Sequence, residues 1–132
     1  MSVDTIANML SMIKNSAIAG EASLDVPYSK ECKSICEVFK KSGYIDEVKV
    51  FKPKETSYKK IHLELAKQGE YIKINDIKRI SKPGRRVYKK ASEIRPSKGE
   101  YSTMVVSTSK GIINDQEARK KKLGGELICE VY

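Results

Sequence analysis

The sequence predicts an α/β (α+β) protein made of two small units, the first of mixed helix and strand and the second mostly β with a short helix. Two observations lead to this prediction. Apolar residues recur at helical spacing in two early stretches, and apolar and polar residues alternate in later ones. The length of 132 residues suits one compact domain or two small ones that share an interface. We place the boundary at the Gln68-Gly69 turn, between residues 1–67 and 68–132.

The first half opens with a predicted helix over residues 4–17. Asp4 is available as its N-cap, and Gly20 lies beyond its end. Its apolar face consists of Ile6, Met9, Leu10, Ile13 and Ala17. A short strand follows over residues 22–26, and Pro27 closes it.

Ser29 is placed to cap a second helix, and Gly43 is placed to end it. The apolar face of this helix consists of Cys32, Ile35, Cys36 and Phe39. Two strands complete the half, over residues 44–51 and 58–65. The resulting order, helix-strand-helix-strand-strand, predicts a small α/β layer.

The second half predicts a strand around Ile72 and Ile74, followed by a basic Pro-Gly turn over residues 81–88. A further strand over residues 102–106 runs directly into a loop, which in turn leads into a short helix. Asn114 or Asp115 caps this helix, and it reaches Lys122. Gly124-Gly125 breaks it. Residues 126–132 then form a final strand whose inward side chains are Leu127, Cys129 and Val131.

The charge of the chain predicts a polyanionic partner. Lys and Arg number 26 against 17 Asp and Glu, for a net charge of +9. Nucleic acid is the commonest such partner. A basic surface that serves only solubility is the alternative, while a membrane surface usually demands an amphipathic helix with bulky apolar anchors. No apolar run approaches the roughly 20 residues that span a bilayer, and the N-terminus lacks the basic start of a signal peptide. We therefore expect no membrane partner.

Neither a metal site, a cofactor nor nucleophilic catalysis is expected. Cys32 and Cys36 lie one helical turn apart on an apolar face, and Cys129 alternates inward on a strand. Such cysteines are usually small core residues, and their odd number without disulfide spacing indicates a reducing compartment. His62 is the single histidine, so a zinc quartet or a Cys-His pair has no support.

A basic stretch between residues 82 and 98 is the first candidate binding feature. It holds one acid, Glu93, against Lys82, Arg85, Arg86, Lys89, Lys90, Arg95 and Lys98. We interpret it as a surface that follows phosphates, with Tyr88 lying against a sugar or base. The alternative is a solvated loop with Tyr88 packed on the core. The second basic run, residues 119–122, equally suits the C-terminal end of a helix dipole.

The stretch Ser107-Thr108-Ser109-Lys110-Gly111 is the second candidate. Hydroxyl groups donate and accept hydrogen bonds, so they read base edges and 2′-hydroxyls, while Lys110 suits a phosphate and Gly111 lets the backbone approach closely. The stretch also fits S-x-x-K, the nucleophile motif of penicillin-binding enzymes, but no S-D-N or K-T-G partner occurs. Nor does any Walker A loop. A hydroxyl-rich structural turn remains the competing interpretation.

Motifs along the whole chain carry a family resemblance. They are Ser81-Lys82-Pro83-Gly84-Arg85-Arg86-Val87-Tyr88, Ser107-Thr108-Ser109-Lys110-Gly111, Glu117-Ala118-Arg119-Lys120 and Gly124-Gly125-Glu126, together with Asp4-Thr5-Ile6-Ala7, Lys14-Asn15 and Val26-Pro27-Tyr28-Ser29-Lys30 near the start. Taken in their order along the chain, they resemble bacterial-type small-subunit ribosomal protein eight. The chain departs from the family at Ser102, where Gly is usual, and at Tyr132, where Trp is common.

The resemblance implies two tightly associated α/β domains. It also implies a protein of the small ribosomal subunit, located in the cytoplasm, with an organellar ribosome left open as the alternative. Members bind the central domain of the small-subunit ribosomal RNA and support assembly, mainly through the C-terminal domain. Carried over, Ser107, Thr108 and Ser109 touch bases and sugars. Phosphate contacts come from Lys110, Lys82, Arg85 and Arg86 around the Pro83-Gly84 turn. Tyr88, Gly124 and Glu126 lie on the same surface, and Lys14, Asn15 and Lys30 add N-terminal contacts.

Three hypotheses follow from these residues. The first is a ribosomal RNA-binding protein, for which the resemblance suggests contact with small-subunit protein five. The second is a small enzyme that uses Ser107 and Lys110, which requires a general base that the sequence does not offer. The third is a free regulatory RNA binder that represses translation of its own operon messenger.

Overall fold

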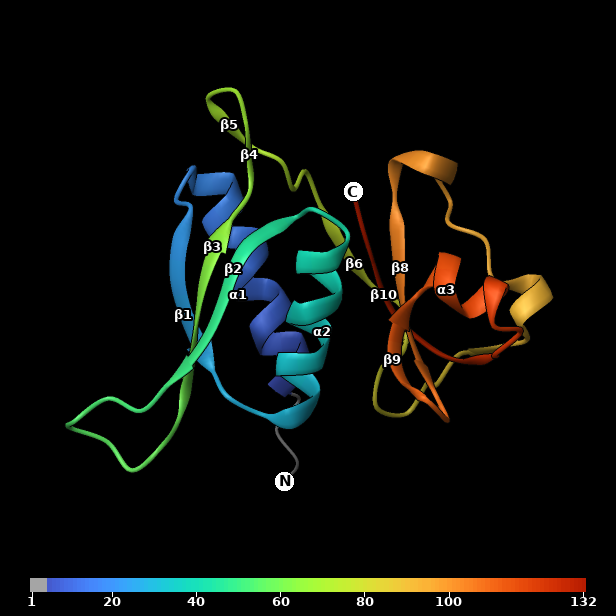
Figure 1. The fold of residues 1–132 in the computed structure, drawn as a ribbon, viewed down its shortest axis with the longest axis horizontal. Coiled ribbons are helices and arrows are strands. Elements are labelled where there is room, and N and C mark those ends of the chain that lie inside the picture. The colour runs from blue at the N-terminus through green and yellow to red at the C-terminus, as the bar shows by residue number, and fades with distance from the viewer. Residues whose placement is uncertain (1–4) are drawn as a thin grey trace. The chain divides into compact units, whose positions relative to one another are not determined.

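The computed structural model describes residues 5–132 and confirms the predicted α+β fold (Figure 1). The chain forms two compact units that divide after Asn75, whereas the sequence places the boundary after residue 67. The difference lies in a hairpin of β4 (Lys67–Gln68) and β5 (Tyr71–Ile72). The Ala66 amide donates to the Tyr44 carbonyl at 3.0 Å, and the Lys73 amide to the Ala66 carbonyl at 2.9 Å. These bonds attach the hairpin to the first unit.

The first unit has the predicted element order. It begins with α1 (Thr5–Ala19), β1 (Ser23–Pro27) and α2 (Lys30–Lys41), and continues with β2 (Ile45–Phe51) and β3 (Lys60–Leu65). The strands form an antiparallel sheet in the order β1-β3-β2. Both helices pack on the face of the sheet that carries Ile61 and Leu63, which are fully buried. The predicted cap Asp4 lies outside the described residues.

The start of α2 follows directly from its sequence. Ser29 is extended, and its hydroxyl accepts a hydrogen bond from the Cys32 amide at 3.1 Å, which confirms the predicted cap. The predicted apolar face is buried: Cys32, Ile35, Cys36 and Phe39 are each at most 1% exposed. Gly43 stands two residues past the helix with φ +88°, a conformation that glycine adopts without strain.

The opposite face of this sheet carries a polar network around the single histidine. His62 Nδ1 lies 2.7 Å from Asp25 Oδ1, and His62 Nε2 lies 2.7 Å from Glu64 Oε1. Hydrogen bonds with Asp25 and then Glu64 raise the pKa of His62 above its ordinary 6.5. The hydrogen bond that Ser23 donates is the main cause that lowers the pKa of Glu64, and the hydrogen bond with His62 lowers it further. His62 and Glu64 lie two residues apart on β3, whereas Asp25 and Ser23 join them from the paired strand β1, a pairing that no local sequence pattern indicates.

We expect the pKa of His62 to lie above 6.5 and to fall toward that value in the Asp25→Asn variant. The folded-state pKa is raised, so this network stabilises the fold fully below pH 6.5. The contribution is lost as pH rises through the folded-state pKa. Because the chain has one histidine, its ring-proton NMR signal measures the pKa directly. A midpoint at or below 6.5 in the unmodified protein would contradict the network.

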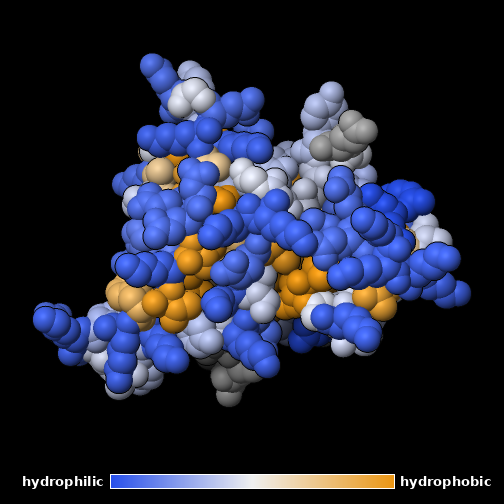
Figure 2. Space-filling model, in the orientation of Figure 1, coloured by the Kyte–Doolittle hydropathy of each residue, from blue (hydrophilic) through white to orange (hydrophobic). Residues whose placement is uncertain are grey.

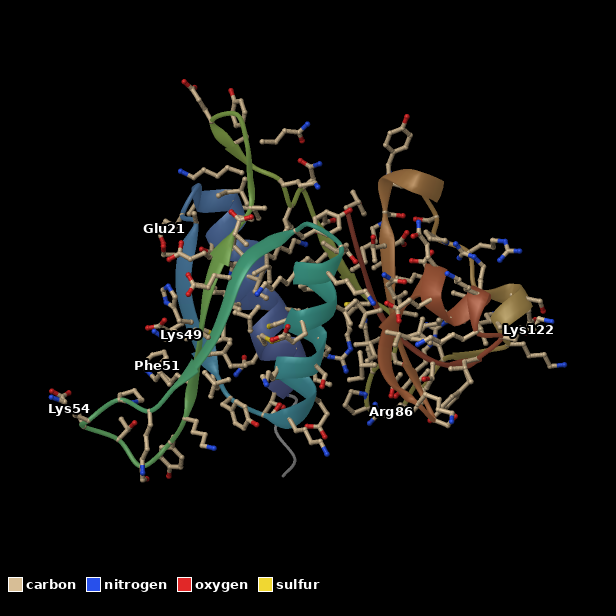
Figure 3. The ribbon with its side chains drawn as sticks, in the orientation of Figure 1. Glu21, Lys49, Phe51, Lys54, Arg86 and Lys122 are labelled. Carbon is tan, nitrogen blue, oxygen red and sulfur yellow. The ribbon has the colours of Figure 1, made fainter. Side chains whose placement is uncertain are left out.

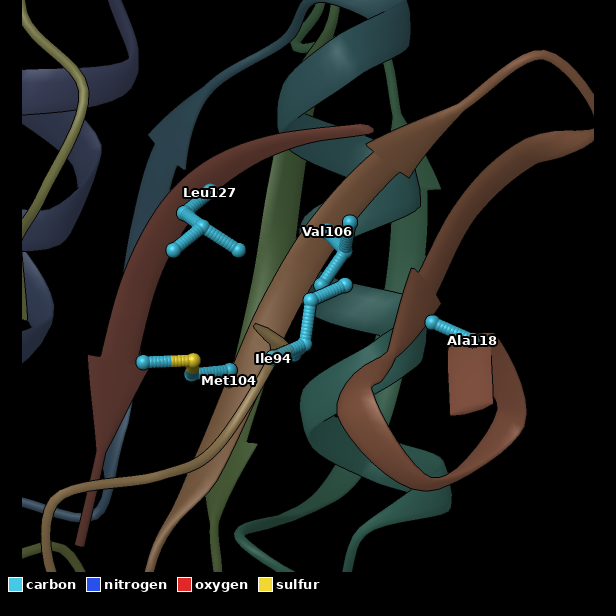
Figure 4. Packing of buried hydrophobic residues seen from close by; sticks show 5 residues of the cluster. All are labelled: Ile94, Met104, Val106, Ala118 and Leu127. Atoms are coloured by element: carbon cyan, nitrogen blue, oxygen red, sulfur yellow. The ribbon is translucent and has the colours of Figure 1, made fainter. Parts of the chain in front are cut away.

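The second unit is a sheet covered by short helical segments. Its strands are β6 (Ile77–Arg79), β7 (Tyr88–Lys89), β8 (Thr103–Thr108), β9 (Gly111–Asn114) and β10 (Gly125–Val131). The helical elements are η1 (Ala91–Glu93), η2 (Gly99–Tyr101) and α3 (Asp115–Lys120). The pairing order is β6-β10-β8-β9, and β7 also pairs with β10. The core of the unit contains Ile94, Met104, Val106, Ala118 and Leu127 (Figure 4).

Three details of the second unit correct the sequence-based expectations. β10 is buried from Leu127 to Val131 without alternation, because it lies in the middle of the sheet. The helix α3 ends at Lys120 and not at Lys122, and Asn114 is its cap, accepting from the Glu117 amide at 2.8 Å. Finally, β9 was not expected at all.

Candidate nucleic-acid interface

The hydroxyl-rich stretch is a tight β-hairpin and not a loop between a strand and a helix. Ser107 and Thr108 end β8, Gly111 begins β9, and Thr108 pairs with Gly111. The Thr108 hydroxyl donates to the Gly111 carbonyl at 2.7 Å and accepts from the Lys110 amide at 3.2 Å. Thr108 therefore holds the turn together, as the competing structural interpretation expected, while Ser109 and Lys110 stand exposed at the tip.

The remaining hydroxyls of the hairpin are available to a ligand. Within residues 5–132, neither the Ser107 nor the Ser109 hydroxyl has a hydrogen-bond partner, although Ser107 is only half exposed. Gly111 has φ +114° with open space where a Cβ would stand. A rigid turn that offers free hydroxyls and a lysine suits recognition of base edges, sugars and phosphates.

The predicted Pro-Gly turn is also a short hairpin. Lys82 and Arg85 exchange backbone hydrogen bonds of 3.0 and 2.9 Å around Pro83 and Gly84. Proline followed by a glycine with φ +86° matches a type II turn. The base of the turn is pinned by buried Ser81, whose hydroxyl accepts from the Val87 amide at 2.8 Å. Lys82, Arg85 and Arg86 consequently project into solvent from a fixed bend.

Strand pairing brings the two hairpins onto one surface. Glu126 on β10 lies opposite Tyr88 on one side and Ser107 on the other. Directly paired residues of an antiparallel sheet share a face, so these three side chains form a row. Arg86, labelled in Figure 3, extends the row through a 3.2 Å ion pair with Glu126. We call Arg86, Tyr88, Ser107 and Glu126 the cross-strand row.

Tyr88 is 66% exposed, so the alternative that it packs into the core is wrong. Its ring stands on the same face as Ser107, free to lie against a sugar or base. Figure 2 shows hydrophilic side chains over most of the face in view, in keeping with a chain of which 33% is charged and in which Lys and Arg outnumber Asp and Glu. The sign of that surplus favours a polyanion over a neutral ligand.

Two glycines permit the close approach of these strands. A Cβ on Gly125 would stand 2.0 Å from the Ser107 carbonyl oxygen, and one on Gly124 would stand 2.7 Å from the Lys89 carbonyl oxygen. From the residues alone, Gly124-Gly125 was predicted to end a helix, and the family resemblance placed Gly124 on the RNA-binding surface. In the structure Gly124 directly precedes β10 and Gly125 begins it, at the point where the backbones of β7 and β8 lie closest to them.

The expected N-terminal contacts belong to the first unit. Lys30 is the exposed first residue of α2, beside the start of α1, since the Cys32 thiol donates to the Thr5 carbonyl at 3.7 Å. Lys14 and exposed Asn15 lie further along α1. Lys14 lies nine positions after Thr5, which is about 14 Å at the helical rise. Lys30 is therefore separate from the pair Lys14 and Asn15.

The cross-strand row and its two hairpins contain neither a histidine nor a cysteine. Across residues 5–132, no group of His, Cys, Asp and Glu could hold a metal ion. His62 lies on β3 in the first unit, and burial raises the pKa of the Cys129 thiol to about 12. Within the same range, no helix is both long and apolar enough to cross a membrane.

Comparison with known proteins gives a consistent result. A family profile described as Ribosomal protein S8 matches residues 4–132. The small ribosomal subunit protein uS8 of Rhodopirellula baltica is 40% identical over 133 residues, covering 99% of both chains. That of Syntrophus aciditrophicus is 45% identical over 130 residues, covering 98% of this chain and 97% of its own. That of Kosmotoga olearia is 41% identical, covering 98% of each chain.

Proposed function

The chain belongs to the ribosomal protein S8 family, and from this premise we propose that it binds the central domain of the small-subunit ribosomal RNA and supports subunit assembly. Membership makes it a structural constituent of the small ribosomal subunit and not an enzyme. The more specific role, direct binding of one region of the RNA, is inferred from the surface of the second unit.

The observation that carries the proposal is the cross-strand row between the two hairpins. Tyr88, Glu126 and Ser107 stand side by side on adjacent strands, with the exposed tip of Ser109 and Lys110 at one end. Folded RNA presents 2′-hydroxyls and base edges in a wide, shallow minor groove. Ser107 and Ser109 bind these groups, Tyr88 lies against a sugar, and Lys110, Lys82 and Arg85 bind the flanking phosphates.

Glu126 has a positioning role within this arrangement. Its carboxylate would repel a phosphate, but its ion pair with Arg86 offsets that charge and fixes the guanidinium beside Tyr88. Thr108 and Gly111 act in the same way on the hairpin, by holding its tip. In the first unit, Lys14, Asn15 and Lys30 supply separate contacts to the RNA.

Ser107→Ala and Lys110→Ala test the proposal. Loss of Ser107 should weaken binding to a folded central-domain RNA fragment by about 1–3 kcal/mol, and Lys110→Ala by less, with a smaller dependence on salt. Filter binding across salt concentrations measures both effects. Ser57→Ala and Lys49→Ala, at exposed positions of the first unit, serve as matched controls. Unchanged RNA affinity in both site variants would overturn the assignment.

The same surface binds any RNA that folds like the ribosomal site, so a messenger of the protein's own operon is a second ligand under this proposal. Co-sedimentation with small subunits separates a resident ribosomal protein from a free regulatory binder. We place the protein in small subunits of the cytoplasm or an organelle, beside small-subunit protein five. Crosslinking in purified subunits tests both neighbours, RNA and protein.

A further inference from the structure

A basic pocket lies outside the surface described so far. It has a volume of about 470 Å³, is open to solvent, and is lined by Lys90, Ala91, Ser92, Arg95, Arg119 and Lys122. The first three residues come from the start of η1, Arg95 follows η1, and Arg119 belongs to the last turn of α3. Lys122 lies just beyond that helix, as Figure 3 shows.

Arg119 is held in place by the fold. Its Nη1 donates to the Ile94 carbonyl at 3.0 Å and to Asp115 Oδ2 at 2.9 Å. Asp115 is itself fixed, since it is 3% exposed and its Oδ1 accepts from the Met104 amide at 3.0 Å. The guanidinium keeps further N–H groups for a ligand. A donor that is already immobilised loses little entropy when it binds.

The pocket has a surplus of positive charge. Asp115 offsets the charge of Arg119, but across residues 5–132 no carboxylate pairs with Lys90, Arg95 or Lys122. Glu93 is the nearby acid in the sequence. Its carboxylate is exposed, accepts from the Lys90 backbone amide at 3.1 Å, and does not line the pocket. Concentrated cations in a concave site attract a compact anion.

Lys122 occupies a costly backbone conformation. Its φ is +57°, and among residues 5–132 it is the one non-glycine residue with positive φ. Glycine is the usual residue at this place after a helix, because a Cβ is strained there. A lysine in such a conformation, with its side chain on the pocket, points to a use for the charge.

We propose that this pocket binds a backbone phosphate of RNA, next to the segment of the RNA chain that the cross-strand row contacts. The two places adjoin: Gly124 follows Lys122 by two residues, and a Cβ on it would stand 3.0 Å from the Lys90 Cα. Lys90 directly follows β7, which carries Tyr88. The inference rests on the proposed RNA-binding function and adds a further phosphate site to it.

Lys122→Gly is the informative variant, because it removes the cation and relieves the strained backbone together. We expect the protein to melt at a higher temperature and yet to bind the central-domain RNA fragment about fivefold more weakly at 0.15 M salt. The slope of log affinity against log salt should decrease by about 0.7–0.9, the value for one lost phosphate contact. Adding Lys90→Ala should weaken binding further.

Lys121→Ala is the matched control. It removes one positive charge from the neighbouring residue, which pairs with Glu117 at 3.7 Å and does not line the pocket. If Lys121→Ala lost as much RNA affinity as Lys122→Gly, net charge alone would explain the loss, and the inference that the pocket binds a phosphate would be overturned.

The outcomes also separate the pocket from the proposed function. If the unmodified protein fails to bind the fragment, the proposed function fails. If it binds and Lys122→Gly combined with Lys90→Ala matches it in affinity and slope, the pocket inference fails alone. A titration with inorganic phosphate, followed by NMR, shows whether the pocket binds a free anion in place of an RNA phosphate. Phosphate binding that the variants abolish without any loss of RNA affinity would overturn the RNA assignment.

Discussion

Replacing Gly125 with alanine should destabilise the second unit by about 3–5 kcal/mol, in the range of severe steric substitutions. The new Cβ would stand 2.0 Å from the Ser107 carbonyl oxygen, 2.9 Å from its carbon and 3.2 Å from the Thr108 Cα. All three are backbone atoms, so no side-chain rotation relieves the overlap. The strands β8 and β10 must separate where Glu126 faces Ser107. Urea denaturation of the full chain measures the loss.

Gly20→Ala is the control for the general effect of removing a glycine. Gly20 has φ +76° but open space where a Cβ would stand, so this variant should lose only about 1 kcal/mol of backbone strain. Gly125→Ala should also weaken RNA binding in conditions where it remains folded, because it displaces Ser107. Equal stability losses for the two variants would show that the strands are less closely packed than the structure indicates.

The contrast between these glycines shows what the sequence could and could not predict. Ser29, Gly43 and the Pro83-Gly84 turn were predicted because each acts within a few residues of its own position. The role of Gly125 depends on a strand far away in the sequence, so its pattern indicated only a helix end. Local chemistry is readable from a sequence, whereas strand pairing depends on contacts that no local pattern records.

The strand β9 was missed for a similar reason. Its sequence, Gly111 to Asn114, is short, and its two isoleucines are half buried with no alternation to reveal a strand. It exists because Thr108 to Val105 on β8 offer it hydrogen bonds. The candidate residues around it were found through hydroxyl chemistry and family resemblance. Their shared surface, including the pair of Arg86 and Glu126, became visible only once the strands were placed.

Glu130 is a buried carboxylate to which no motif or spacing in the sequence points. It lies in β10 and is 4% exposed, yet it carries a carboxylate. Its Oε2 accepts from the Ser97 amide at 2.8 Å and from the Ser102 hydroxyl at 2.7 Å, and its Oε1 accepts from the Ser97 hydroxyl at 2.9 Å. Ser102 thus anchors β8, the strand that leads into the hairpin of residues 107–111.

Glu130→Ala should destabilise the protein by about 3 kcal/mol, because it leaves the buried Ser102 hydroxyl without its acceptor, breaks the hydrogen bonds from Ser97 and creates a cavity. Glu130→Gln is the matched control: its amide oxygen can still accept from both donors, so it should lose about 1 kcal/mol. Urea denaturation at neutral pH measures the difference. Similar losses in both variants would mean that charge, and not acceptance of these bonds, is what matters.

Acidification distinguishes the charge from the hydrogen bonds. Burial alone would raise the pKa of Glu130, but the hydrogen bonds from Ser102 and Ser97, with the backbone of Lys98, hold that pKa below its ordinary 4.5. A lowered folded-state pKa stabilises the protein above pH 4.5, and this stabilisation is lost as pH falls through the folded-state value. The stability gap between the unmodified protein and Glu130→Gln should therefore close in acid. A gap that stayed constant from neutral to acidic pH would show that Glu130 is not charged in the fold. When both proteins also carry Ser102→Gly, the stability difference between the one with Glu130 and the one with Glu130→Gln should be smaller at neutral pH. The reason is that Ser102→Gly removes the first of the hydrogen bonds that favour the carboxylate.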